Sequence, residues 1–310
     1  MGVREQDNRR KTLFGQDNNS LFNLIAINII AFVLLYFVLI IYYLSGSSRS
    51  DFFANVFSWV SMPASLNELL YKPWTIITHM IAHISIWQLI GNMLWLWAFG
   101  FILQDLTGNS KLIPIYIYGA LAGALFYLLS FNLIPRLQPL ITTDTYFGAG
   151  AGVTAIVVAT TLLAPGYRIF QMLNGGIPLW VITIIYVLID FAGLSSNAFP
   201  HHVAHLAGAG MGAFFINRLH KGQDWSEWMN NAWESFINLF NPDKPAKKQK
   251  PVKQQLFYNN KGRNPFKKTT NITEQKINEI LDKISQKGYD SLSKEEKEIL
   301  RRAGEENNIE

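Results

Sequence analysis

Cysteine is absent from this sequence of 310 residues. Its absence excludes a disulfide framework, a thiolate zinc site and a cysteine nucleophile. Charged residues are also scarce, because Asp, Glu, Lys and Arg make up 16% of the chain, against about 25% in an average soluble protein. Hydrophobic residues make up 49%. This balance excludes a plain soluble enzyme and indicates that part of the chain is embedded in a membrane.

The few charged residues are unevenly distributed. Between residues 21 and 217 there are only ten, which are Arg49, Asp51, Glu68, Lys72, Asp105, Lys111, Arg136, Asp144, Arg168 and Asp190. The mean hydropathy of +0.13 is therefore an average over an apolar core and two polar ends. The net charge of +5 lies largely in the C-terminal tail, where a membrane surface explains it better than a nucleic acid does. We expect no nucleic-acid partner.

Six apolar stretches approach or exceed the roughly 20 residues that a helix needs to cross a bilayer. They cover residues 21–44, 84–103, 112–134, 147–164, 177–194 and 201–219, of which the fourth is short. The first has no small-residue cleavage site, so it is interpreted as a span rather than a signal peptide. The sequence predicts an all-α polytopic membrane protein. Its six transmembrane helices form a bundle in residues 21–219, after a polar segment in residues 1–20.

Residues 45–83 join the first two spans and are too apolar for a solvated loop. They are rich in Phe, Trp, Leu and Met but are interrupted by Pro63 and Pro73, so we expect them to lie in the membrane interface. Basic residues set the orientation of the spans. If the chain has six spans, one side of the membrane holds the basic residues before the first span, in the even-numbered loops and after the last span. These residues are Arg4, Arg9, Arg10, Lys11, Lys111, Arg168, Arg218 and Lys221. Both termini are therefore predicted to be cytoplasmic.

Residues 220–271 are predicted to be a basic, largely disordered linker. Within it, residues 241–268 hold nine Lys or Arg against one Asp, with four prolines. This composition favours a tether, either held near anionic lipid headgroups or solvated without a lipid partner. Residues 272–304 show helical spacing, a turn at residues 287–290, and Ser293 with Glu296 as a capping box. We expect a small helical hairpin that docks on a partner, a second copy or the membrane core.

Polar groups inside a bilayer are costly, so they indicate function. Gln88 and Asn92 lie roughly 6 and 12 Å into the second span, and His205 lies about 6 Å into the sixth, at about 1.5 Å per residue. The fourth span also starts at the outer side, around Gly150. We predict that Gln88, Asn92, Gly150 and His205 converge at one level just beneath the outer surface.

Glycines four residues apart allow helices to approach each other closely. Two such pairs, Gly148 with Gly152 and Gly208 with Gly212, predict close packing of the fourth and sixth spans. The third span has a similar pair, Gly119 with Gly123. For all three pairs we expect a packing role.

Residues 21–219 resemble the rhomboid family of intramembrane serine proteases. The resemblance rests on residues 83–97 (HISIWQLIGNMLWLW), the Gly148-Ala-Gly-Ala-Gly152 opening of the fourth span and Ala204-His-Leu-Ala-Gly208 in the sixth. It implies a Gly-x-Ser motif that supplies a nucleophile, a sixth-span histidine as general base, and a second-span His-x-x-x-Asn pair that helps to form an oxyanion hole. His205 matches the base, and Asn92 matches the asparagine.

Two positions depart from the family pattern. Gly150 stands where the serine is expected, and Gln88 stands where the second-span histidine is expected. A glutamine amide can still donate to an oxyanion, and loss of one such donor costs about 10² to 10³ in rate. A glycine cannot form an acyl-enzyme, and loss of a nucleophile has cost on the order of 10⁶ in kcat. His205 is then a base without a partner.

Other polar side chains are candidates for chemistry. Thr154, Ser195 and Ser196 are candidate substitute nucleophiles, but Thr154 lies one helical turn away from Gly150, which usually breaks the geometry. His201, His202 and His205 suggest a metal cluster. His202 and His205 lie three residues apart with no third ligand nearby, so we expect packing histidines and neither a metal nor another cofactor. Asp190 is interpreted as an interfacial carboxylate rather than a proton relay.

These observations favour a rhomboid-like pseudoprotease that binds transmembrane segments of client proteins and cannot cut them. The alternative is an active intramembrane serine endopeptidase, either with an unidentified hydroxyl as nucleophile or as a chain whose serine was replaced. A transporter is a third interpretation, but no charged pair, inverted repeat or pair of broken spans supports it. The lipid bilayer, client segments and anionic headgroups are the expected partners.

Overall fold

The computed structural model describes residues 19–170, 175–239 and 274–306. The chain divides into two compact units, Met1–Pro242 and Asp243–Glu310. Each unit is described by itself.

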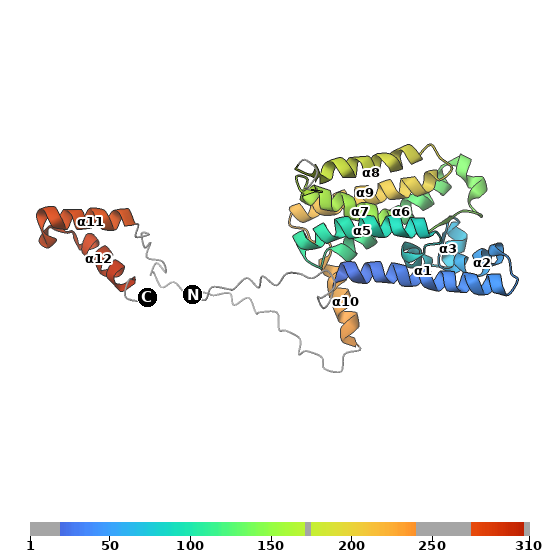
Figure 1. Cartoon of the computed structure of the whole chain (residues 1–310), viewed down its shortest axis with the longest axis horizontal. Coiled ribbons are helices and arrows are strands. Elements are labelled where there is room, and N and C mark those ends of the chain that lie inside the picture. The colour runs from blue at the N-terminus through green and yellow to red at the C-terminus, as the bar shows by residue number, and fades with distance from the viewer. Residues whose placement is uncertain (1–18, 171–174, 240–273, 307–310) are drawn as a thin grey trace, which may run out of the picture. The chain divides into compact units, whose positions relative to one another are not determined.

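Six long helices build the first unit and run alongside one another (Figure 1). They are α1 (Ser20–Leu44), α5 (Ile86–Thr107), α6 (Leu112–Leu133), α7 (Gly150–Leu163), α8 (Leu179–Gly193) and α9 (Phe199–His220). Among the described residues, α1, α5 and α6 are long and apolar enough to cross a membrane, and α7 and α8 are shorter apolar helices. The predicted all-α membrane bundle is confirmed, and each predicted span corresponds to one of these helices.

The connection between α1 and α5 is folded into short elements. These are α2 (Arg49–Asn55), η1 (Phe57–Trp59), β1 (Met62–Pro63), α3 (Leu66–Tyr71), α4 (Thr75–Thr78) and η2 (His79–Ile81). Strand β1 pairs antiparallel with β2 (Thr145–Tyr146), with Met62 opposite Tyr146. Because β2 lies just before α7, this pairing fixes the approach of the chain to the start of α7.

Other connections are short. The helix η3 (Pro135–Leu140) follows α6, and strands β3 (Arg168–Ile169) and β4 (Ile177–Pro178) pair antiparallel between α7 and α8. Arg168 closes this second ribbon, because its guanidinium donates to the carbonyl oxygen of Gly176 at 3.0 Å.

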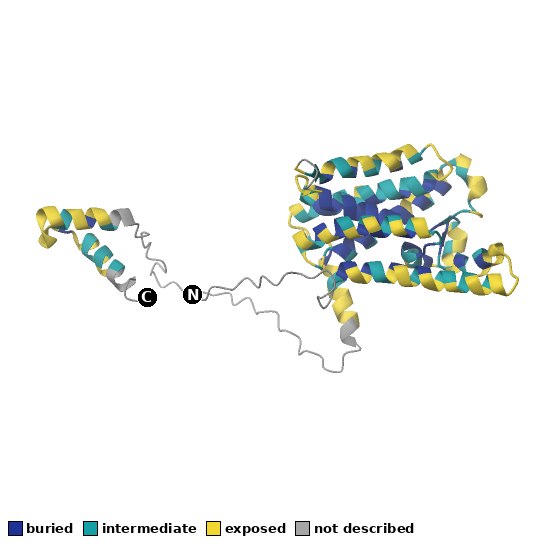
Figure 2. Ribbon diagram, viewed as in Figure 1, coloured by how far each residue is buried: buried dark blue, intermediate teal, exposed yellow. Residues whose placement is uncertain are grey.

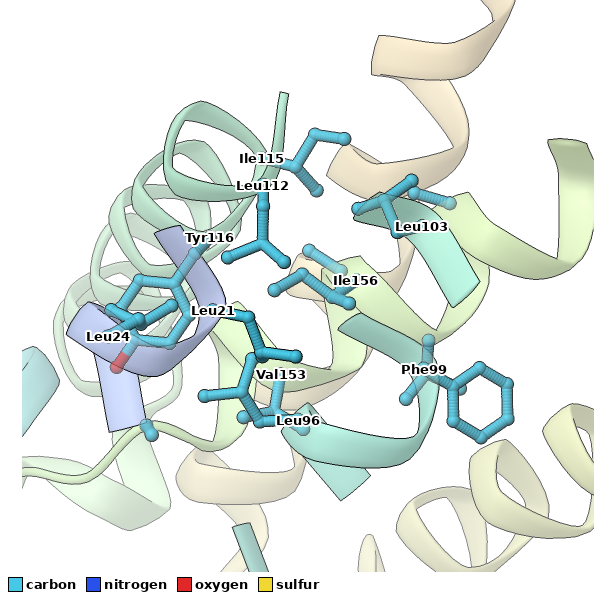
Figure 3. Packing of buried hydrophobic residues seen from close by; sticks show 14 of the residues in the cluster. Leu21, Leu24, Leu96, Phe99, Leu103, Leu112, Ile115, Tyr116, Val153 and Ile156 are labelled. Carbon is cyan, nitrogen blue, oxygen red and sulfur yellow. The ribbon is translucent and has the colours of Figure 1, made fainter. Parts of the chain in front are cut away.

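The core lies around α7. Val153 and Ile156 of α7 are fully buried and pack with Leu96 of α5, Leu112 of α6 and Leu21 of α1 (Figure 3). Figure 2 shows buried residues along the middle of the bundle and exposed residues along α1 and α8. Many of these exposed side chains are large and apolar, as expected for helices that face lipid.

Close approach of α9 to α7 depends on Gly208 and Gly212. A Cβ atom at either position would lie 2.2 Å from a carbonyl oxygen of α7, that of Ala151 or Ala155. Ordinary van der Waals contact begins at 3.4 Å, so no side chain fits there. Gly208 and Gly212 thus allow α9 to pack directly on the backbone of α7.

The third-span pair, Gly119 and Gly123 of α6, lies against α7 in the same way. Cβ atoms there would lie 2.3 and 2.5 Å from the Cβ atoms of Ala155 and Ala151. Glycines on α6 and on α9 therefore hold α7 between these two helices.

The prediction that Gly148 and Gly152 face the sixth span is wrong. A Cβ atom at Gly152 would meet Tyr116 of α6 at 2.7 Å. Gly148 lies outside the helix, which starts at Gly150, and has a φ of +103° that favours glycine. The sequence pattern assumed one continuous helix from residue 147, whereas the chain turns before α7.

Residues 224–239 continue the first unit. Helix α10 (Glu227–Leu239) projects away from the bundle at the end where α1 begins (Figure 1). Tyr118 of α6 donates to the carbonyl oxygen of Trp225 at 3.0 Å, and Asp224 forms an ion pair with Lys111. The prediction that residues 220–271 are largely disordered is therefore wrong for its first part, because these contacts order it. Residues 240–273, with the predicted basic tether, lie outside the described residues.

The second unit contains the predicted hairpin. It comprises α11 (Glu274–Lys287), η4 (Tyr289–Ser291) and α12 (Lys294–Glu306). The capping box is present, because Glu296 accepts from the Ser293 backbone at 2.7 Å while the Glu296 backbone donates to Oγ of Ser293 at 3.2 Å. Lys283 of α11 reaches across to Glu296 at 2.8 Å.

Candidate functional site

The nucleophile position of the family pattern is filled by a histidine ring. Gly150 is the first residue of α7 and faces His205 of α9. A Cβ atom on Gly150 would lie 2.1 Å from Nε2 of His205, 2.7 Å from Cε1 and 2.9 Å from Cδ2. All three values are below 3.0 Å, which real Cβ contacts essentially never show. No side chain fits at position 150 while the ring keeps this place.

Asp190 of α8 holds that ring from its other edge. Nδ1 of His205 lies 2.9 Å from Oδ1 of Asp190, and Nδ1 of His202 lies 2.9 Å from the same oxygen. Asp190 is buried, whereas the side chains of His202 and His205 are 24% and 27% exposed. The carboxylate of Asp190 bridges two imidazoles inside the bundle, and the interpretation as an interfacial carboxylate did not include these contacts.

The relation of Asp190 to His205 is that of the carboxylate and the base in a serine hydrolase triad. A carboxylate at Nδ1 fixes the tautomer and turns Nε2 toward the position of the nucleophile. In this chain Nε2 points at a glycine. The carboxylate and imidazole of such an arrangement are thus present at Asp190 and His205, and residue 150 carries no hydroxyl.

His83 links the second-span asparagine to the start of α7. Nδ2 of Asn92 lies 3.1 Å from Nε2 of His83, and the backbone N–H of Ala149 donates to the same nitrogen at 3.4 Å. Nε2 is thus the acceptor, and Nδ1 donates to the carbonyl oxygen of Ile81 at 3.2 Å. Burial lowers the pKa of His83 to about 4, so the ring is neutral at pH 7. The sequence predicts an interfacial position for residues 45–83 but not these contacts of His83.

Gln88 packs on the backbone at the turn before α7. A Cβ atom at Gly148 would lie 2.7 Å from Nε2 of Gln88, so the amide occupies the space beside this glycine. The structure therefore brings the four predicted residues to one segment, residues 148–150. Gln88 reaches Gly148, Asn92 reaches Ala149 through His83, and His205 reaches Gly150.

The substitute hydroxyls donate to backbone carbonyls. Thr154 is buried and donates to the carbonyl oxygen of Gly150 at 2.8 Å. Ser195 and Ser196 donate to Ala192 at 3.0 Å and to Gly193 at 2.7 Å. A nucleophilic hydroxyl must instead be hydrogen-bonded to its general base. None of these three hydroxyls has that relation to a histidine in the described part of the chain.

The three histidines of α9 separate into two groups. His201 points away from the others and lies against the rings of Tyr127 and Tyr146, at 5.5 and 5.6 Å between centroids. His202 and His205 share Asp190 as a third potential ligand, and the three ligand atoms lie within 4.8 Å of one another. The prediction that these two histidines lack a third ligand is therefore wrong. A charged residue inside the fifth span was the signal for it.

Comparison with known proteins identifies two segments. Residues 71–222 match the rhomboid domain, and residues 265–305 match a family of unknown function (DUF6576). The RHOMBOID-like protein 12, mitochondrial, of Arabidopsis thaliana is 28% identical over 158 residues, which cover 48% of this chain and 47% of that protein. Rhomboid protein 1, mitochondrial, of Saccharomyces cerevisiae is 31% identical over 146 residues, 46% of this chain and 40% of that protein.

The chain spans less than half the length of each of these two relatives. The matched domain contains α5 to α9 and every residue of the site around Gly150 and His205, including His83 before α5 and Gly148 and Ala149 before α7. The helical membrane bundle, the domain match and the two relatives together show that this chain is a multi-pass membrane protein of the rhomboid family.

Proposed function

We propose that this chain is a rhomboid pseudoprotease that binds transmembrane segments of client proteins without cleaving them. One observation carries the proposal: Nε2 of His205 lies 2.1 Å from where the Cβ atom of residue 150 would be. Covalent serine chemistry needs a hydroxyl at that place, with the base beside it. Gly150 has no hydroxyl, and the base has taken its space.

The N–H groups that could stabilise an oxyanion also contact another group, the ring of His83. The backbone N–H of Ala149 and an N–H of Asn92 both point at Nε2 of His83. Oxyanion stabilisation requires donors aimed at the developing charge and ready to bond it. These contacts support a site that has lost more of its catalytic arrangement than the serine alone.

An apolar groove on the surface of α6 and α9 supports binding of a helix. The groove has a volume of about 700 Å³, and its lining includes Phe126 of α6 and Val203, Ala207, Gly210 and Phe214 of α9. From Val203 to Phe214 the helix rises about 16 Å, roughly half of the bilayer core. Small residues such as Ala207 and Gly210 permit close approach of another helix. The occupant we propose is one transmembrane helix of a client.

The orientation of the chain in the membrane and its contact with lipid headgroups are also proposals. Both termini are cytoplasmic, on the basis of the basic residues that flank the spans. Residues 241–268 bind anionic lipid headgroups through their nine Lys and Arg side chains.

Catalysis is tested with the full chain in proteoliposomes that contain a test transmembrane substrate. We expect no cleavage and no labelling by a fluorophosphonate serine probe. The His205→Ala variant is expected to behave identically, because Nε2 activates no hydroxyl. Labelling that disappears in Thr154→Ala or Ser196→Ala would establish an active protease and overturn the proposal.

Client binding is tested with two glycines that are matched in their surroundings. A Cβ atom at Gly210 or at Gly91 of α5 meets no described atom within 4 Å, so a larger side chain is tolerated at both. Gly210→Leu fills the groove and is expected to reduce photo-crosslinking of a client helix at Ala207 at least tenfold. Gly91→Leu, on another helix, serves as the control. Equal crosslinking in both variants would show that clients do not use this groove.

A further inference from the structure

Two histidines and one aspartate converge where α8 ends and α9 begins. We propose that Asp190, His202 and His205 bind one divalent transition-metal ion, with Zn²⁺ as the best-matched ion. The donor set is two imidazole nitrogens and one carboxylate oxygen, which suits Zn²⁺ and other late first-row metals. This inference does not depend on client binding.

The geometry is close to that of a bound site. Oδ1 of Asp190 lies 2.9 Å from each Nδ1, and all three atoms lie within 4.8 Å of one another. Bonds of about 2.0–2.2 Å to a tetrahedral ion place ligand atoms about 3.3–3.5 Å apart. Each distance from Asp190 therefore needs to change by only a few tenths of an ångström. Three protein ligands leave a fourth position for water or another ligand.

Each imidazole has a glycine that makes room for it. A Cβ atom at Gly193 would lie 2.3 Å from Cε1 and Nε2 of His202, and one at Gly150 would lie 2.1 Å from Nε2 of His205. Neither ring could keep its place beside any other residue. The two glycines thus allow both rings to turn Nδ1 toward the same carboxylate.

The absence of a serine at position 150 therefore has a second consequence. In a serine protease the base must leave space for the nucleophile at Nε2. Here that space belongs to the ring of His205, which places its other nitrogen beside His202. The same glycine that removes the nucleophile converts the base into a metal ligand.

The ion can reach this site, and few other groups compete for it. The His202 and His205 side chains are partly exposed. The chain has six histidines and no cysteine, so thiolate binding does not interfere. Of the other four histidines, His79 and His83 are fully buried, His201 faces two tyrosines, and His220 stands alone at the far end of α9. A bound ion would join α8 to α9.

The test is metal binding by the full chain, purified in detergent with a tag that lacks histidine and freed of metal with a chelator. We expect one Zn²⁺ per chain by elemental analysis, and a Co²⁺ visible spectrum typical of nitrogen and oxygen ligands. His202→Gln and Asp190→Asn should each weaken binding more than the about 10- to 100-fold that loss of an outer-shell partner costs. His201→Ala is the matched control and should bind as the unmodified chain does.

A further variant tests the role of position 150. Gly150→Ser should also weaken Zn²⁺ binding, because the new side chain displaces the His205 ring, and the size-exclusion profile without metal confirms that each variant is folded. The proposal is overturned if the unmodified chain holds no stoichiometric Zn²⁺ or Co²⁺. It is equally overturned if His202→Gln binds as well as His201→Ala does. Undiminished binding by Gly150→Ser would disprove the connection between the missing serine and the metal.

Discussion

Substitution of Gly150 tests whether the His205 ring really occupies the nucleophile position. In Gly150→Ala the added Cβ atom would start 2.1 Å from Nε2, while ordinary contact begins at 3.4 Å. The ring must therefore retreat by about 1.3 Å or the helices must separate. The ring cannot simply shift along its own axis, because Nδ1 is already 2.9 Å from Asp190. It has to rotate and loosen that hydrogen bond, or α7 and α9 must move apart.

The expected cost is an overpacking penalty of about 1–3 kcal/mol. The intrinsic effect of the exchange has the opposite sign and is at most about 1 kcal/mol, the advantage of alanine over glycine in a helix interior, because Gly150 is the first residue of α7. Gly91→Ala in α5 isolates that intrinsic effect, since its Cβ atom meets no described atom within 4 Å. We therefore expect Gly150→Ala to lower the unfolding midpoint in detergent while Gly91→Ala leaves it unchanged or raises it.

The same reasoning applies to repair of the protease. Gly150→Ser should not give measurable cleavage of a test transmembrane substrate, because the displaced ring is no longer held by Asp190 in the orientation that a base needs. Adding Gln88→His should not rescue it. The reasoning fails if Gly150→Ala is as stable as Gly91→Ala, or if Gly150→Ser alone cleaves the substrate efficiently.

Three further predictions concern other parts of the chain. Tags at either end should be accessible only from the cytoplasmic side, and an external C-terminal tag would mean that one of the six spans is wrong. Trp228 and Trp233 of α10 are exposed beside the bundle, so brominated lipids should quench their fluorescence more than a soluble quencher does, and the reverse would place α10 in water. Hydrogen bonds from Lys283 and Ser293 lower the pKa of Glu296, so this carboxylate stabilises the hairpin above its unfolded value near 4.5, and the stability is lost as the pH falls through the lower folded value. Amide exchange of residues 277–301 should accelerate in that window, and Glu296→Gln should remove the dependence.

The helices were predictable because apolar length alone specifies them. The predicted and observed ends of the first and third spans differ by a single residue at most, and the capping box at Ser293 is present as predicted. α10 was not predictable in the same way. Its order depends on contacts with α6 and with the connection before it, such as Tyr118 and Lys111 with residues 224–228, more than 100 positions away in the sequence.

The position of the candidate site could be predicted, but the side-chain contacts that link its residues could not. Depth along each span placed Gln88, Asn92, Gly150 and His205 at one level, and the structure brings all four to residues 148–150. The residues that connect them were missed. His83 and Asp190 act through contacts across helices, and single-sequence periodicity does not carry such contacts.

Gly150 shows that replacing a side chain by glycine does not simply leave an empty space in a packed protein. A pattern in which Gly150 replaces serine suggests an empty place that a hydroxyl could fill again. Helices held together by Gly208 and Gly212 leave no such void, because protein interiors are close-packed and a neighbouring group takes the space. Here the neighbour is the ring of His205, whose other ring nitrogen, Nδ1, lies 2.9 Å from Asp190. The side chain at position 150 and the placement of the His205 ring are therefore coupled, and each variant at position 150 should move that ring.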